Sequence, residues 1–182
     1  RASVPEVERV KPMPNELTWR NDWLLGIEQL DEDHRRMVHL LNLLFAAPET
    51  PMTGAGPTET GVQTAETIVA DARAILLERL DEVIEHLRAH FAREEAFLHS
   101  IDFPGYDEHS SEHALQMAEF VQLRREILGQ GTDHLDAEII GGIKRWFFNH
   151  VIAEDHRFAA YYFEKILERE EDWNNLRLYA TG

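Results

Sequence analysis

Two pairs of potential metal ligands lie close together within residues 86–113. His90 and Glu94 are four residues apart, and so are His109 and His113. Residues four apart lie above one another on the same face of an α-helix, so each pair can direct its side chains into one space. Imidazole nitrogens and carboxylate oxygens both bind transition metals. The spacing therefore predicts a metal site wherever two such helices face each other.

A turn between the two pairs provides that facing arrangement. Asp102 and Phe103 are followed by Pro104 and Gly105, and a Pro-Gly step interrupts a helix and favours a chain reversal. The two flanking helices would then lie antiparallel. One would carry a His/Glu pair and the other a His/His pair, both facing the same space.

Three more candidate ligands lie outside this segment. His34 follows the same stripe as Met37 and Leu41, and the spacings of three and four residues place it on the core side of a helix. His150 and Asp155 are five residues apart, which is about 140° around an α-helix, so we expect that they do not stack directly. They could still flank a central site, particularly if Asp155 bridges two ions.

The candidate ligands are His34, His90, Glu94, His109, His113, His150 and Asp155. Five imidazoles and two carboxylates exceed the four ligands of a tetrahedral zinc ion and suit a pair of six-coordinate ions. Imidazole combined with carboxylate favours iron, whereas magnesium and calcium sites are rich in oxygen ligands. The residue types thus predict a two-ion site in which iron is the favoured metal.

Amphipathic helices separated by short connections position these residues. The pattern predicts an all-α fold, an up-down-up-down four-helix bundle. Aspartates at two of the starts, Asp31 and Asp133, are expected N-caps. The expected helices span about 32–47, 63–99, 106–128 and 134–169.

The remaining segments divide the chain. Residues 1–18 contain three prolines and no sustained period, so we expect an irregular N-terminal arm. Residues 48–62 carry Pro, Gly and Thr with few bulky apolar side chains, which indicates a flexible insert within a helical domain of residues 19–170. Residues 171–182 are expected to form a short C-terminal tail.

Composition argues against several classes of partner. The net charge of −16 argues against binding to nucleic acid or to anionic membrane surfaces. With no cysteine, the chain can form neither disulfides nor a thiolate metal site. The longest apolar runs fall short of the roughly 20 residues that a membrane span requires, and no signal peptide is visible. We therefore expect a cytoplasmic protein without a membrane partner.

Taken together, the motifs resemble those of bacterial hemerythrin domains. The resemblance rests on Trp19 seven residues before Gly26, on "LDEDH" ending at His34 and on "HFAREE" beginning at His90. It continues in "FPGYDEHSSEH", which ends at His113, and in "WFFNHVIAED", which ends at Asp155. It covers roughly residues 19–165 and fills all seven ligand positions of the family.

The resemblance implies a non-haem site of two iron ions bridged by an oxo or hydroxo group. The implied ligands of one iron are His109, His113 and His150. Those of the other are His34 and His90, with one position left open, and the implied bridging carboxylates are Glu94 and Asp155. The implied function is reversible binding of dioxygen by a carrier, store or sensor, and not enzymatic catalysis.

The resemblance also implies an oxygen pocket beside the open iron. Phe147 stands where the family commonly has a leucine next to that iron. Trp146 and Phe147 precede His150 by four and three residues, and Val151 follows it. These three apolar residues are the predicted pocket wall.

Two other functions are considered. A ferritin-like di-iron oxidase would carry Glu-x-x-His motifs, and none of the ten histidines has a glutamate three residues before it. A signalling module could use the same site to sense oxygen, nitric oxide or iron, with a signalling domain in the same full-length protein. The histidines expected to be ordinary surface or packing residues are His39, His86, His99, His134 and His156.

Overall fold

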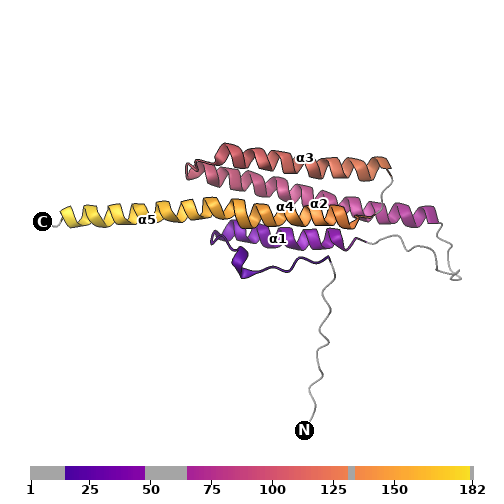
Figure 1. The fold of residues 1–182 in the computed structure, drawn as a ribbon, viewed down its shortest axis with the longest axis horizontal. Helices are drawn as coiled ribbons and strands as arrows, with labels where there is room; N and C mark the ends of the chain where they lie inside the picture. Colours follow the sequence, from indigo (N-terminus) through magenta and orange to yellow (C-terminus); the bar gives the residue numbers. More distant parts are fainter. Residues whose placement is uncertain (1–14, 48–64, 131–133, 181–182) are drawn as a thin grey trace, which may run out of the picture.

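The computed structural model describes residues 15–47, 65–130 and 134–180, which form a bundle of long helices (Figure 1). Its elements are η1 (Asn21–Trp23), α1 (Glu28–Phe45), α2 (Ala65–Ser100), α3 (Tyr106–Gln130), α4 (Ala137–Phe148), η2 (Asn149–Glu154) and α5 (Asp155–Ala180). Because α4, η2 and α5 follow one another without a break, they form the fourth helix, and the predicted four-helix bundle is confirmed. Most of the predicted arm and the whole insert lie outside the described residues.

The first long helix begins one turn earlier than the sequence predicted. α1 starts at Glu28, and Asp31 lies inside it instead of capping it. The Asp31 carboxylate accepts hydrogen bonds from the backbone N–H groups of Leu25 at 2.7 Å and Gly26 at 3.1 Å. Gly26 adopts a φ of 80°, a left-handed conformation that glycine takes at little cost. Asp31 therefore fastens the entering loop to the helix, which explains why its N-cap prediction was wrong.

The reversal predicted at the Pro-Gly step is present between α2 and α3. Asp102 has a φ of 52°, and the N–H of Phe103 bonds to the carbonyl of Leu98 at 3.0 Å. This is the Schellman arrangement that ends many helices. A Cβ atom on Gly105 would lie 2.7 Å from the Phe103 ring, so only glycine fits there without a shift. The closed turn sets α2 and α3 side by side (Figure 1).

The last helix is capped three residues later than predicted. The Asp136 carboxylate accepts a hydrogen bond from the N–H of Ile139 at 2.8 Å, which is the contact of an N-cap. Asp133, the predicted cap, lies outside the described residues. At its other end α5 remains helical to Ala180, so the segment expected to be a tail extends the helix past the others (Figure 1).

Two apolar clusters fill the interior, and each contacts one of two buried histidines. Phe91 of the larger cluster stacks on the His113 ring, with centroids 3.9 Å apart. Phe158 of the smaller cluster meets the His109 ring edge-on at 5.8 Å. The polar centre is therefore enclosed by apolar packing at both ends. Within the described ranges, none of the helices is long and apolar enough to cross a membrane.

Candidate metal centre

The five histidines and two carboxylates singled out in the sequence meet at the centre of the bundle. Each is at most 4% exposed. Every one of the five imidazoles brings its Nε2 atom close to a carboxylate oxygen. The distances are 3.2 Å for His34 to Asp155, 3.1 Å for His90 to Glu94, 2.5 Å for His109 to Glu94, 3.4 Å for His113 to Glu94 and 3.6 Å for His150 to Asp155.

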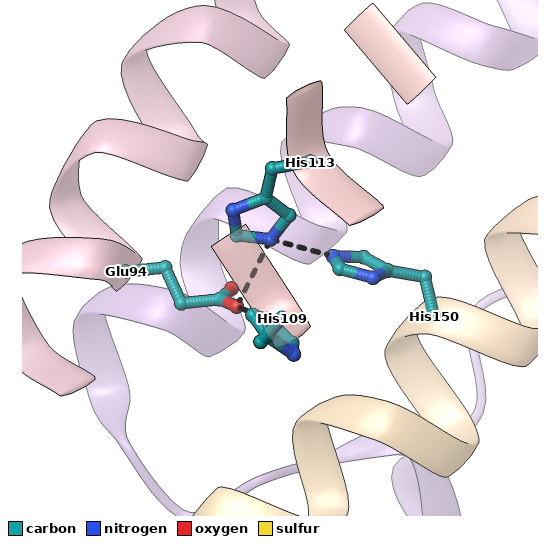
Figure 2. A group of neighbouring side chains, drawn as sticks. All are labelled: Glu94, His109, His113 and His150. Atoms are coloured by element: carbon teal, nitrogen blue, oxygen red, sulfur yellow. Dashed lines mark hydrogen bonds and ion pairs between the residues drawn. The ribbon is translucent and has the colours of Figure 1, made fainter. Parts of the chain in front are cut away.

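Six of the seven residues form two overlapping sets of potential ligands. One set contains Glu94, His109, His113 and His150 (Figure 2), and the other contains His34, His90 and Glu94. Within each set, the ligand atoms lie within 4.8 Å of one another. Glu94 belongs to both sets. Asp155 also lies between them, because its Oδ2 is 3.2 Å from His34 and its Oδ1 is 3.6 Å from His109.

A π-helical turn brings His150 and Asp155 together. In η2 the backbone N–H of Asp155 bonds to the carbonyl of His150, five residues earlier. This wider turn places residues five apart, instead of four, above one another. The expectation that the two side chains do not stack was wrong because it assumed an α-helix throughout. Val151 is buried while Ile152 is 37% exposed, so Ile152 lies on the solvent side of the widened turn.

Several buried polar atoms of the centre have no hydrogen-bond partner. Glu94 Oε2, both carboxylate oxygens of Asp155 and both ring nitrogens of His34 are buried without a hydrogen bond. Leaving one such group unsatisfied costs about 1–3 kcal/mol, and more if it is charged. Nearly all buried polar groups in native proteins are paired. A divalent cation would satisfy the oxygens and nitrogens together, so the residues fit a metal site of mixed nitrogen and oxygen ligands.

The surroundings of the centre shift the pKa values of its buried carboxylates and of His34. Burial raises the pKa of Asp155 well above its usual value, and the charge of Glu94 raises it further. Burial would also raise the pKa of Glu94, but hydrogen bonds from the histidines, His109 first, hold it well below its usual value. For His34, burial and the neighbouring charge of His90 lower the pKa to about 3. A neutral His34 and an ionised Glu94 are the protonation states that metal binding requires, whereas a metal would have to displace the proton that the raised pKa of Asp155 favours.

Two more carboxylates contact the outward nitrogens of these histidines, and the sequence analysis did not identify them. Glu95 Oε1 lies 2.9 Å from Nδ1 of His113. Asp33 Oδ2 lies 3.5 Å from Nδ1 of His90, and Arg93 binds the same carboxylate at 2.7 and 2.8 Å. Burial would raise the pKa of Asp33, but the contacts with His90 and Arg93 outweigh it and lower the pKa to about 2. Both contacts join different helices, so no spacing along one helix predicts them.

The other histidines stand apart from both ligand sets. His86 is half-buried, with its Nε2 2.9 Å from the backbone carbonyl of Asp33. His156 places Nδ1 3.0 Å from the carbonyl of Val151. The exposed histidines are His39, His99 and His134.

The three residues of the predicted oxygen pocket lie around His150 in different ways. The Trp146 ring stacks on the His150 ring with centroids 5.8 Å apart. Phe147 is fully buried and meets Trp23 edge-on at 5.8 Å. Val151 is fully buried directly after His150. A surface pocket of about 480 Å³ opens on the Trp146 side and has His150 in its wall. The assignment of these residues to an oxygen pocket stays a prediction.

Comparison of the sequence with those of known proteins finds similar bacterial proteins. The bacteriohemerythrin of Stenotrophomonas maltophilia is 27% identical over 143 residues, which is 79% of this chain and 79% of that protein. The bacteriohemerythrin of Ralstonia nicotianae is 30% identical over 105 residues, covering 57% of this chain and 76% of that protein. Both relatives carry the family name that the sequence motifs suggested.

Solved structures of hemerythrin and a model of the hemerythrin family also match this chain. Crystal structures of hemerythrin variants superpose with a TM-score of 0.61 at 16% identity, covering 79% of this chain and 95% of those chains. At that identity the likeness shows the fold alone. The model of the hemerythrin HHE cation binding domain matches residues 25–162, a span that includes every residue of the buried centre. The chain therefore belongs to the hemerythrin family.

Proposed function

We propose that this protein holds two iron ions in the buried centre and binds dioxygen reversibly there. The observation that carries the proposal is the pair of shared carboxylates. Glu94 belongs to both ligand sets, and Asp155 reaches both through different oxygens, although neither carboxylate has its full complement of partners. Two cations, one in each set, would satisfy both carboxylates at once.

The proposed ligands follow from the two sets. One ion would be held by His109, His113 and His150, the other by His34 and His90, and both by Glu94 and Asp155. An iron pair supplies the electrons that reversible dioxygen binding requires. The unequal number of histidines supports a binding position for a small molecule on the side of His34 and His90, because that ion would have fewer protein ligands.

Apolar packing would protect such a site from water. Phe91 and Phe158 close the two ends of the centre, and Val151 is fully buried beside it. A low-polarity enclosure strengthens electrostatic interactions inside it and limits proton access. This environment supports reversible binding over turnover, in keeping with the bacteriohemerythrin name of the relatives.

One observation favours a sensing role for the same site. α5 begins at Asp155, one of the proposed bridging ligands, and continues to Ala180 beyond the other helices (Figure 1). A change at the metals could thus be carried along a single helix. A signalling domain in the full-length protein would support this use, and dioxygen, nitric oxide or iron would be the signal.

The test is metal loading followed by oxygen cycling. Metal-free protein is reconstituted with ferrous iron without oxygen, and iron is counted per chain by mass spectrometry, with a parallel sample offered zinc and iron together. We expect about two irons per chain and an absorption band that forms in air and disappears under argon over repeated cycles. One ion per chain in the iron-loaded sample would refute the di-iron proposal, whereas the mixed sample reports only relative affinity, because such sites generally bind zinc more tightly than ferrous iron. Two irons without a reversible band would refute oxygen binding alone.

A further inference from the structure

The proposed ligand histidines differ in what their outward nitrogens contact. A metal-bound imidazole is oriented by the partner of its second nitrogen, which fixes the tautomer and raises the basicity of the metal-binding nitrogen. His113 has such a partner in Glu95, whose Oε1 is 2.9 Å from Nδ1. His34 has none, since its Nδ1 is buried without a hydrogen bond. Glu95 thus stands out among the carboxylates near the centre.

A comparison with Asp33 shows why the charge of Glu95 matters. Asp33 approaches Nδ1 of His90 at 3.5 Å, but both of its oxygens are bound by the guanidinium of Arg93 at 2.7 and 2.8 Å. Much of its negative charge is therefore offset locally. In the part of the chain whose side chains are described, the carboxylate of Glu95 contacts His113 alone, at a distance of normal hydrogen bonding. The two outer carboxylates consequently act on their histidines with unequal strength.

Packing already holds the His113 ring in place without Glu95. Phe91 stacks on it at a centroid distance of 3.9 Å and an interplanar angle of 10°. Glu95 itself has a side chain 29% exposed, at the edge of the buried centre. Its replacement should leave the fold and the ring position largely unchanged. The role left for Glu95 is electronic, through the proton on Nδ1 and the charge behind it.

We propose that Glu95 is a positioning residue that keeps the proton of His113 on Nδ1, leaves Nε2 unprotonated for the metal and lowers the reduction potential of that iron. The inference rests on the proposed di-iron site. A carboxylate behind an imidazole makes the imidazole a stronger donor, which stabilises ferric over ferrous iron. Asp33, with its charge offset by Arg93, exerts the weaker effect on the side of His90.

The test separates the effect of the negative charge of Glu95 from that of its hydrogen bond with His113. In Glu95→Gln the amide oxygen can still accept the Nδ1 proton, but the charge is gone. Its matched control is Glu85→Gln, which removes a charge from the same helix at an exposed ion pair with Arg88. The midpoint potential of the iron pair is measured by anaerobic titration at equal iron content. We expect Glu95→Gln to weaken ferric relative to ferrous binding by about tenfold, which raises the potential by about 59 mV per electron, and Glu85→Gln to leave it at the parent value.

Removal of Arg93 should have the opposite effect. Arg93→Gln frees the charge of Asp33, so His90 becomes the stronger donor and the potential should fall. Arg88→Gln is its matched control. Equal potentials in Glu95→Gln and the parent would overturn the proposal, as would shifts of the same size in Glu85→Gln. If circular dichroism shows that Arg93→Gln has lost its folded structure, the comparison of Glu95→Gln with Glu85→Gln alone decides the proposal.

A second readout does not depend on iron. In metal-free protein, where either ring nitrogen can carry the proton, long-range proton–nitrogen spectra of the imidazoles report which one does. We expect the His113 proton on Nδ1 in the parent and in Glu95→Gln, and its exchange with solvent to accelerate at least tenfold in Glu95→Ala. A parent protein with that proton on Nε2 would overturn the proposal. The iron count of the parent tests the di-iron function separately, so failure of one is distinguishable from failure of the other.

Discussion

Replacement of Asp155 by asparagine should affect the metal-free and the metal-loaded protein in opposite directions. In the metal-free protein the carboxylate is fully buried, and both of its oxygens lack hydrogen bonds. Burial and the charge of Glu94 raise its pKa well above the usual value. A group with a raised carboxyl pKa stabilises the folded state below its unfolded pKa, and this contribution is lost as pH rises through the folded value. At neutral pH Asp155 therefore lowers the free energy of unfolding of the metal-free protein.

The size of the effect follows from the same contacts. Asparagine leaves a buried polar group in place but removes the charge, and each unit by which the pKa is raised corresponds to about 1.4 kcal/mol, so Asp155→Asn should raise the free energy of unfolding of the metal-free protein by at least about 1 kcal/mol. In the loaded protein the carboxylate is a proposed ligand of both ions. Loss of a group in the outer sphere of a metal weakens binding about 10–100-fold, and loss of a direct ligand should do at least as much for each ion. At about 1.4 kcal/mol per tenfold, two ions together lose about 3–6 kcal/mol.

The assay is urea unfolding of parent and Asp155→Asn with and without ferrous iron, in the absence of oxygen. The control is Glu119→Gln, which removes a charge from an exposed side chain of α3. We expect the variant to be more stable than the parent without iron and less stable with it, whereas the control keeps the parent order in both. A variant that is less stable in both conditions would refute the reasoning, because Asp155 would then be stabilised by the protein itself.

Three further changes test other parts of the centre. Glu94→Ala should lower the iron content far more than His86→Ala, because Glu94 belongs to both ligand sets whereas His86 contacts a backbone carbonyl; full iron in the first and loss in the second would invert the assignment. Excision of most of residues 48–62 should leave fold and iron loading intact, since halving a loop changes its closure free energy by only about 0.6 kcal/mol; the checks are circular dichroism and metal analysis. Phe147→Ala should destabilise the protein by about 3–5 kcal/mol, since Phe147 is fully buried. It should also hasten decay of the oxygenated band at equal iron loading, and an unchanged decay rate would place another side chain at the pocket.

The sequence predicted the parts of the centre that depend on regular helices. His90 and Glu94, or His109 and His113, need only the four-residue repeat of α2 and α3 and one turn between them. The stripe that carries His34 is equally regular, so its burial follows from the apolar residues beside it. The burial of these side chains agrees with the sequence because one periodicity determines both which side of a helix is buried and which residues share that side; their role as metal ligands stays a prediction.

The spacing of residues along one helix could not predict contacts between different helices. Glu95 meets His113 across the α2–α3 pair, and Asp33 meets Arg93 and His90 across α1 and α2. Either acid could equally have faced solvent, since spacing along one helix says nothing about the rotation of its neighbour. The start of α1 was misplaced for a related reason. An aspartate can bind N–H groups of its own helix or of the loop before it, and Asp31 binds the loop.

The π-helical turn shows how one local irregularity can be required by the whole centre. His150 must reach the set that contains His113, and Asp155 must lie between both sets, yet on an α-helix side chains five apart point about 140° away from each other. The extra residue in η2 removes that difference, and the bulge forms where Ile152 faces solvent and needs no internal space. A π turn forgoes regular α-helical hydrogen bonding and is rare without a functional reason. Its position between two proposed ligands therefore indicates that the ligand geometry, and not the helix, determines the backbone here.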